Sequence, residues 1–486
     1  MSYANGMHLY ELFAILIYLF ALISVGVLSY KRHLTEADFI IGGRSLGSWL
    51  TALAAHASDM SSWLFMAYPA MVFVEGPIRI WTAVGLFLFM YLNWQFVAPK
   101  IRVATEEYNS MTFSSFFESR VADTSGWLRV FTSLMCLLFY TVYLSAGLIG
   151  MAYVIGILFN TPFQLNVLIG ILIIIPYVFI GGYLTLAWID LFQGLFLMLA
   201  ILFVPLYLLP KVGGFSAVEK SYEMRNVAFS LFPDVSLKTG KSLLTLILGM
   251  GLGYFGQPHI ITKFMGIKQV RNIPRSKMIG MSWMFVSLGA AVLVGFVGSA
   301  FFQTGIANPE LIFISLVQDA FHPFLIGFFS CAILAATINA NGSQILVLAS
   351  TLSEDLYKRL LRKHAPSSEL LMVSRLSVIL VGLAAYLIAA FSTSTIFSIV
   401  LYAWSGLGCS FGPLILFSLY YKRLNRYGAW GGVLSGGLTV AFWPLIERLG
   451  GFSLPPLLPG FFASSCAILL FSQLKAPFFP KSVHET

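Results

Sequence analysis

Charge is scarce in this sequence, in which only 10% of the 486 residues are Asp, Glu, Lys or Arg. Soluble domains average about 25% charged residues, so this composition excludes an ordinary water-soluble protein. Cysteine is scarce too, and the four residues present, Cys136, Cys331, Cys409 and Cys466, are single and lie inside apolar stretches. Isolated cysteines of this kind argue against a disulfide framework or a thiolate metal site.

Positive charge is missing from residues 1–30, which contain no Lys or Arg. A secretory signal peptide begins with a basic segment, so the first apolar stretch is expected to be a retained helix. The sequence also contains no H-E-x-x-H motif and no phosphate-binding loop. These absences predict a protein that is not an enzyme.

Apolar residues dominate instead, at 58% of the chain. Apolar stretches of roughly 20 residues recur along its whole length, and each can cross a hydrocarbon core of about 30 Å as a helix. The fold class predicted is an all-α polytopic membrane protein with about 13 transmembrane helices. The expected spans are 8–29, 46–74, 78–98, 128–158, 163–182, 186–210, 242–263, 277–303, 322–352, 371–392, 394–421, 428–448 and 453–474.

The basic residues predict the orientation of these spans. If the N-terminus is outside, most of the 29 Lys and Arg residues fall on one side, which the positive-inside rule assigns to the cytoplasm. The C-terminus is then cytoplasmic. This distribution explains the net charge of +9 through topology, and no nucleic-acid partner is expected.

Two expected spans are interrupted by polar and flexible residues. The second contains AAHASDMSSW (54–63), and the seventh contains GMGLGYFGQPH (249–259). Unwound backbone at membrane depth survives only where it is buried in protein or lines a wet cavity. Broken helices at corresponding positions of two inverted halves point to the binding site of a secondary transporter.

This pattern predicts five segments. Residues 1–45 form a first helix and cytoplasmic loop, and residues 424–486 form two additional helices and a short cytoplasmic tail. Between them lie the first five-helix repeat (46–210), an external loop (211–241) and the second five-helix repeat (242–423).

Asp59 lies about twelve residues into its span, or roughly 18 Å along a helix and near the midplane. Burying a carboxylate there costs at least about 2.5–3.5 kcal/mol on insertion scales, so it needs a cation, a partner or a proton. Serine hydroxyls and freed carbonyls at the break suit a hard cation such as sodium. A structural role as a cap for the interrupted helix is the alternative.

The strings ASDMSSW, GYFGQPH (253–259), FIGGYLTLAWIDLFQ (179–193) and SEDLYK (353–358) resemble the sodium/solute symporter family over nearly the whole chain. The resemblance implies a LeuT-like five-plus-five inverted repeat with broken second and seventh spans. It also implies sodium-driven import of L-proline or a similar small amino acid across a bacterial cell inner membrane, with no cofactor.

The resemblance further implies a sodium site between the second and ninth spans. Its ligands would be the carbonyls of Ala57, Met60 and Ala336 and the side chains at 339 and 340, with Asp59 supporting. A departure occurs here, because the usual Ser-Thr pair is Asn339-Ala340. The loss of a hydroxyl leaves proton coupling open as an alternative, in which case His56 is the residue to suspect.

Family motifs place substrate contacts at Ser61, Ser62, Trp63, Tyr143, Met250, Tyr254 and Pro258. Met250 stands where the relatives that carry proline have tryptophan. On a continuous helix Met250, Tyr254 and Pro258 would share one face. Asp190 matches an aspartate that serves a second cation in some members, with an ion pair as the equally weighted alternative.

A nutrient sensor with a transporter-like domain is the remaining alternative function. Only about a dozen residues are expected beyond the last span, too few for a signalling domain.

Overall fold

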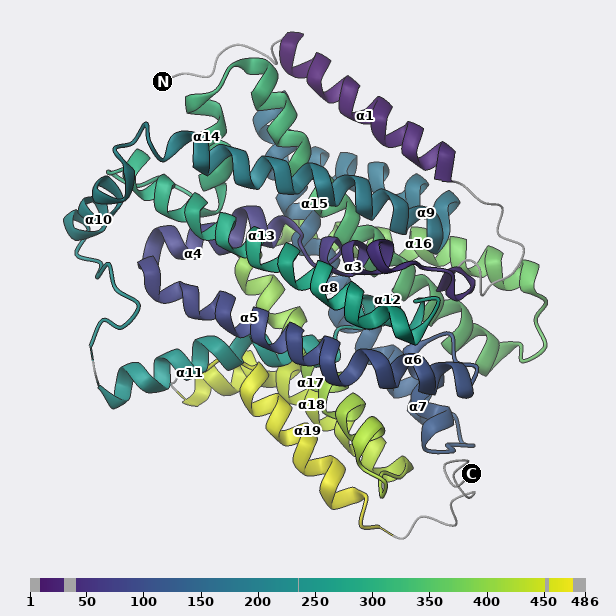
Figure 1. Ribbon diagram of the computed structural model, residues 1–486. Helices are drawn as coiled ribbons and strands as arrows, with labels where there is room; N and C mark the ends of the chain where they lie inside the picture. Colours follow the sequence, from purple (N-terminus) through teal and green to yellow (C-terminus); the bar gives the residue numbers. More distant parts are fainter. Residues whose placement is uncertain (1–8, 30–40, 235, 451–453, 475–486) are drawn as a thin grey trace.

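The computed structural model describes residues 9–29, 41–234, 236–450 and 454–474, and in these ranges every regular element is a helix (Figure 1). One isolated bridge pairs Leu46 with Ile267. The first half contains α1 (Leu9–Ser29), η1 (Gly42–Arg44), α3 (Ser48–Ala57), η2 (Trp63–Ala67), α4 (Tyr68–Glu75), η3 (Gly76–Arg79), α5 (Ile80–Leu92), η4 (Asn93–Val97), α6 (Ala98–Glu107), α7 (Phe113–Arg120), α8 (Trp127–Phe159) and α9 (Phe163–Leu208).

The second half begins with α10 (Gly214–Met224), which lies in the predicted external loop. It continues with α11 (Leu237–Gly251), η5 (Leu252–Gly256), α12 (Pro258–Met265), η6 (Val270–Asn272), α13 (Ile273–Phe301), η7 (Pro309–Leu311), α14 (Ile312–Ala320), α15 (Pro323–Ser350), η8 (Thr351–Leu361), α16 (Ser367–Phe391), α17 (Ile396–Tyr420), α18 (Arg426–Gly450) and α19 (Leu457–Phe471).

The helices have the length and composition of membrane spans. Among the described residues, nine helical runs are long and apolar enough to cross a bilayer. Two shorter apolar segments accompany them: Phe163–Ile175, which is the first part of α9, and Leu457–Phe471, which is α19. Some runs cover more than one predicted span: Trp63–Glu107 includes α4, α5 and α6, and α9 extends over both the fifth and the sixth. The all-helical membrane fold is confirmed, whereas the number thirteen stays a prediction.

Both predicted helix breaks are present. In the second span α3 ends at Ala57, and the chain resumes at Trp63 as the π-helical turn η2. In the seventh span α11 passes into the 3-10 turn η5, Gln257 is extended (φ −90°, ψ 104°), and α12 starts at Pro258. Proline suits this first helical position because it has no backbone N–H to leave unpaired.

The two interrupted spans lie inside the bundle rather than at its rim. The first half of the second span packs on α13, α9 and α12, and η5 packs on α17. Close approach depends on small residues: a methyl group on Gly253 would lie 2.0 Å from Nε1 of Trp404. Figure 1 shows α1 along one edge of the bundle and α18 and α19 along another.

Candidate functional site

The break after α3 changes the backbone hydrogen bonds around Asp59. In a continuous helix the N–H of Ser61 would bond to the carbonyl of Ala57. Here it bonds to the carbonyl of Asp59 at 3.1 Å instead. The Ala57 carbonyl therefore loses its usual helical partner, as a cation ligand at a helix break should.

A hydrogen bond between side chains joins the two breaks. The Tyr254 hydroxyl, from η5, donates to Oδ2 of Asp59 at 2.5 Å. Tyr254 is 2% exposed and Asp59 is partly buried, so little water surrounds this bond. Hydrogen bonds to a charged group are roughly twice as strong as neutral ones, so this contact ties the two interrupted helices together.

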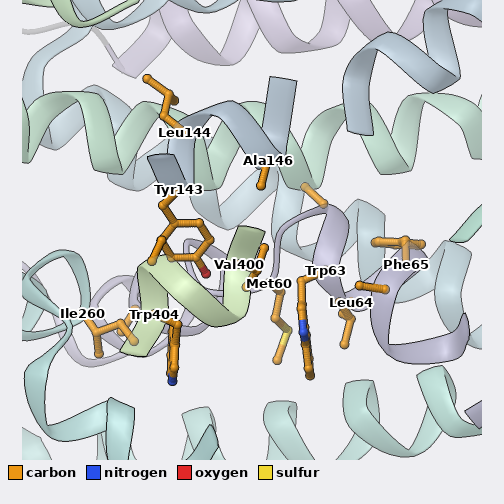
Figure 2. Close-up of a cluster of buried hydrophobic side chains, with 14 of the residues drawn as sticks. Met60, Trp63, Leu64, Phe65, Tyr143, Leu144, Ala146, Ile260, Val400 and Trp404 are labelled. Carbon is orange, nitrogen blue, oxygen red and sulfur yellow. The ribbon is translucent and has the colours of Figure 1, made fainter. Parts of the chain in front are cut away.

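A cavity of about 20 Å³ adjoins this pair, which is room for about one water molecule. Figure 2 shows how Met60, Trp63, Tyr143, Val400 and Trp404 gather here from the second span, α8 and α17. The lining consists of one carboxylate among apolar and aromatic side chains: Asp59, Met60, Trp63, Leu64, Leu86, Tyr143, Met250, Tyr254, Met284, Leu288, Val400 and Trp404.

The structure brings four of the seven predicted substrate residues to this cavity: Trp63, Tyr143, Met250 and Tyr254. Met250 and Tyr254 remain together although the helix breaks between Tyr254 and Pro258. The continuous face predicted for Met250, Tyr254 and Pro258 is therefore wrong. Pro258 lines a different cavity, because the extended Gln257 redirects the chain.

Ser61 and Ser62 are buried but do not line the cavity. The Ser61 hydroxyl accepts from the backbone N–H of Trp63 at 3.3 Å, so it stabilises the restart of the helix. Ser62 packs against α8, where a methyl group on Gly150 would lie 2.6 Å from its Cβ. Their substrate role stays a prediction.

Sequence reasoning missed Trp404, which is central to the site. Its ring meets Tyr254 edge-on with centroids 5.1 Å apart, and its Nε1–H donates to the carbonyl of Met250 at 2.8 Å. Its own carbonyl accepts from Nε2 of Gln257 at 3.1 Å. The only signal in the sequence was a tryptophan beside small residues in WSG (404–406), within an otherwise ordinary apolar span.

Among the predicted sodium ligands, Asn339 lies next to α9. Its Nδ2 donates weakly to the carbonyl of Asp190 at 3.5 Å, and its Oδ1 is buried with no hydrogen-bond partner among the described residues. Ala57 also packs on α9, since a methyl group on Gly194 would lie 3.1 Å from its Cβ. A free amide oxygen fits a sodium ligand.

The other predicted ligands on α15 differ in what they offer. Ala340 is 1% exposed and supplies no side-chain oxygen. Ala336 lies within the unbroken α15, whose carbonyls keep helical geometry. The full sodium ligand set stays a prediction.

Asp190 forms an ion pair with a lysine side chain. Lys263 Nζ, from α12, lies 3.0 Å from Oδ2 of Asp190, and the side chains are 2% and 0% exposed. This buried ion pair is the alternative that the sequence left open for Asp190. A second cation at Asp190 stays a prediction, and it would have to share the carboxylate with Lys263.

The His56 side chain forms a hydrogen bond with Trp94 and stacks on its ring. The Nε1–H of Trp94 donates to its Nε2 at 3.1 Å, so in the neutral ring the proton sits on Nδ1. The two rings stack with centroids 6.1 Å apart. This contact gives His56 a packing role and directs Nε2 to Trp94.

Comparison with known proteins shows which family this chain resembles. The profile of the sodium:solute symporter family matches residues 39–436. The sodium/proline symporter of Escherichia coli K12 is 38% identical over 472 residues, covering 95% of this chain and 92% of that protein. The high-affinity proline transporter PutP of Bacillus subtilis 168 is 40% identical over 460 residues, covering 93% of this chain and 95% of that protein.

Solved structures show the same fold. A substrate-bound, outward-open Na⁺-coupled sialic acid symporter superposes with a TM-score of 0.82 at 18% identity, covering 98% of this chain and all of the other. MhsT in complex with L-phenylalanine gives a TM-score of 0.58 at 15% identity, covering 87% of this chain and 97% of MhsT. The fold is therefore the LeuT-like inverted repeat with two broken helices, and the chain belongs to the sodium:solute symporter family.

Proposed function

We propose that this protein is a sodium-coupled symporter that imports L-proline or a similar small amino acid by alternating access. One observation carries the proposal: the Asp59–Tyr254 hydrogen bond joins the two helix breaks at the edge of a largely apolar cavity. The relatives named for proline transport support the choice of substrate.

The geometry suggests how ion and solute are coupled. A cation near the Ala57 carbonyl would compensate the charge of Asp59, whose cost in the membrane is otherwise several kcal/mol. Tyr254 contacts Asp59 and lines the cavity, so any shift of Asp59 on cation binding moves a cavity wall. Sodium binding thereby shapes the solute site before the solute arrives.

The cavity favours a small, partly apolar solute. Its walls supply methionine, leucine and aromatic surface, with the Asp59 carboxylate and tyrosine hydroxyls as the polar groups. An imino acid presents a compact apolar ring and one charged end, which matches this lining. Because the cavity has room for only about one water molecule, the walls must separate to admit the solute.

Proton coupling is the second candidate, and the Asn339-Ala340 pair is the observation that favours it. Uptake of radiolabelled L-proline into proteoliposomes, driven at matched membrane potential by either a sodium or a proton gradient, tests both. Accumulation with sodium alone supports the proposal. Accumulation with protons alone would replace it with a proton symporter.

The proposed location is the inner membrane of a bacterium, with the N-terminus outside and the C-terminus in the cytoplasm. The bacterial relatives and the apolar helices support the membrane, and the distribution of basic residues supports the orientation.

An enzymatic role has one superficial match. GCSFG at 408–412 fits the G-x-S-x-G pattern of a nucleophile elbow, which requires a sharp turn from a strand into a helix. Here the string lies inside the continuous helix α17. The match therefore gives no support to hydrolase chemistry.

A further inference from the structure

A second cavity lies next to the first, separated from it by aromatic contacts. Tyr143 lines the first cavity, His259 lines the second, and their rings meet edge-on with centroids 6.3 Å apart. This second cavity measures about 20 Å³ and lies among α8, α12, α15 and η8. We call it the inner cavity because η8 leads into the basic residues 358–363, which the positive-inside rule assigns to the cytoplasm. It is also lined by Asp355 of the SEDLYK string, which the transport site does not use.

Three polar atoms of this inner cavity's lining are unmatched in the described part of the chain: Oδ2 of Asp355, Oγ of Ser343 and Nε2 of His259. The three residues are 0%, 3% and 0% exposed. A buried polar atom without a partner costs about 1–3 kcal/mol. Three of them around one space make this lining suited to bind a polar ligand.

The hydrogen bonds of His259 use its backbone N–H and Nδ1 and leave Nε2 unmatched among the described residues. The Tyr140 hydroxyl accepts from the backbone N–H of His259 at 2.8 Å and lies 2.9 Å from Nδ1 of the same residue. If the Tyr140 proton is directed to Nδ1, the ring proton of neutral His259 sits on the unmatched Nε2, which then acts as a donor.

Charged groups of both signs line the same cavity. The Lys263 ammonium uses one hydrogen bond on Asp190, at 3.0 Å, and has three N–H groups in all. Asp355 accepts from the Thr112 hydroxyl through Oδ1 at 2.7 Å, and Nε of Arg129 lies 3.9 Å from the same oxygen. Ser114 is a further hydroxyl neighbour of this carboxylate, and no donor is aligned on its Oδ2. A bare cation would meet Lys263 and the His259 donor as well as the carboxylate, whereas a zwitterion can use both kinds of group.

We propose that the inner cavity is a release-side station for the zwitterionic amino-acid solute. The solute carboxylate bonds to His259 and Lys263, and its amino group bonds to Asp355, with the Ser343 hydroxyl as a further partner. The station becomes large enough only when the inner half of the protein opens. This inference rests on the proposed function, since it assigns the route by which that solute leaves.

The test measures the half-saturation concentration of radiolabelled L-proline from each face, in right-side-out and inside-out vesicles containing the full-length protein. Ser343→Ala removes an unmatched hydroxyl and breaks no hydrogen bond within the protein. Asp355→Asn removes the charge with little change of shape. On the cytoplasmic face we expect an increase of about threefold for Ser343→Ala and about tenfold or more for Asp355→Asn. On the external face both should stay within about twofold of wild type.

Glu118→Gln is the matched control. Glu118 lies in the same ion network, 2.6 Å from Arg129, but it does not line the cavity. Its substitution removes the same charge and should leave the ratio between the two faces unchanged.

Three outcomes would overturn the proposal. Unchanged values on the cytoplasmic face would mean that the cavity holds only water. Equal increases on both faces would assign these residues a structural role. A change in the sodium half-saturation alone would make the cavity a cation station. Wild-type vesicles that fail to take up L-proline would instead refute the proposed function itself.

Discussion

At the scale of single residues, Asp59 is the group on which the proposed coupling depends. Asp59→Asn keeps the shape and can still accept from Tyr254, but it removes the charge. We expect sodium-driven uptake to fall at least about 100-fold while insertion persists, because a neutral amide is easier to bury than a carboxylate. Uptake in proteoliposomes, with protein amount measured by gel filtration of a fluorescent fusion, checks this. Wild-type uptake by the variant would contradict the cation-site role.

Tyr254 offers a finer test of the same link. Tyr254→Phe removes only the hydroxyl that donates to Asp59. Losing a hydrogen bond to a charged group costs about 1.5–3 kcal/mol, so the half-saturation concentration for sodium should rise roughly tenfold or more. The control is Tyr91→Phe, because Tyr91 is 40% exposed on the bundle surface. If both variants behave alike, the bond has no part in sodium binding.

Asn339 and Ala340 test whether the cation site is a weakened sodium site. Replacing them with the usual family pair, in Asn339→Ser with Ala340→Thr, adds a hydroxyl oxygen. The sodium half-saturation concentration should then fall severalfold, because hard cations gain from each added oxygen ligand. An unchanged sodium dependence would place the coupling ion elsewhere.

The sequence predicted the polar residues of the site better than its apolar wall. Asp59 and Tyr254 were recognisable because a carboxylate and a glycine-rich string are costly inside a membrane helix and need a reason. Leu86, Leu288 and Val400 carry no such signal, since the same residues line any buried helix. Trp404 was missed for the same reason, and the separation of Pro258 depended on one backbone conformation at Gln257.

At the scale of elements, the broken seventh span is held by its contact with α17. Gly253→Ala would place a methyl group 2.0 Å from Nε1 of Trp404, on a ring that is itself bonded to Met250. We expect transport to be lost and the thermal unfolding midpoint to drop by several degrees. The reason is that the Trp404 ring cannot move away without breaking its hydrogen bond to the Met250 carbonyl.

Gly289→Ala provides the control for this substitution. Gly289 also lies in a helix, α13, but an added methyl group there meets nothing within 4 Å. It should retain transport and stability, since alanine favours a helix over glycine. Equal damage in both variants would show that any substitution of a helical glycine is harmful here and that the Trp404 contact is not special.

The elements themselves were largely predictable. Long apolar runs and the two polar interruptions gave the helices and their breaks, because backbone groups in lipid must pair internally. The sequence did not reveal that α9 runs from the fifth predicted span into the sixth. Apolar residues give little signal for where one buried helix ends and the next begins, so boundaries between adjacent spans are the least certain part of such a prediction.

At the scale of the whole molecule, the proposed orientation makes a prediction about access. Ser216 in the predicted external loop and Ser367 at the start of α16 are both exposed. In a background lacking Cys466, the one native cysteine that is only partly buried, Ser216→Cys should react with a membrane-impermeant maleimide in intact cells. Ser367→Cys should react only after permeabilisation. The reverse pattern would invert the topology.

The buried pair of Lys263 and Asp190 has a consequence for electrical behaviour. Its charges cancel, so if the two side chains move as one unit, they displace no net charge through the transmembrane field. The current of a transport cycle then reports the coupling ions alone, at about 2.3 kcal/mol per charge for each 100 mV. Neutralising only Lys263 would leave a mobile negative charge, and the voltage dependence of transport would change even where the solute affinity did not.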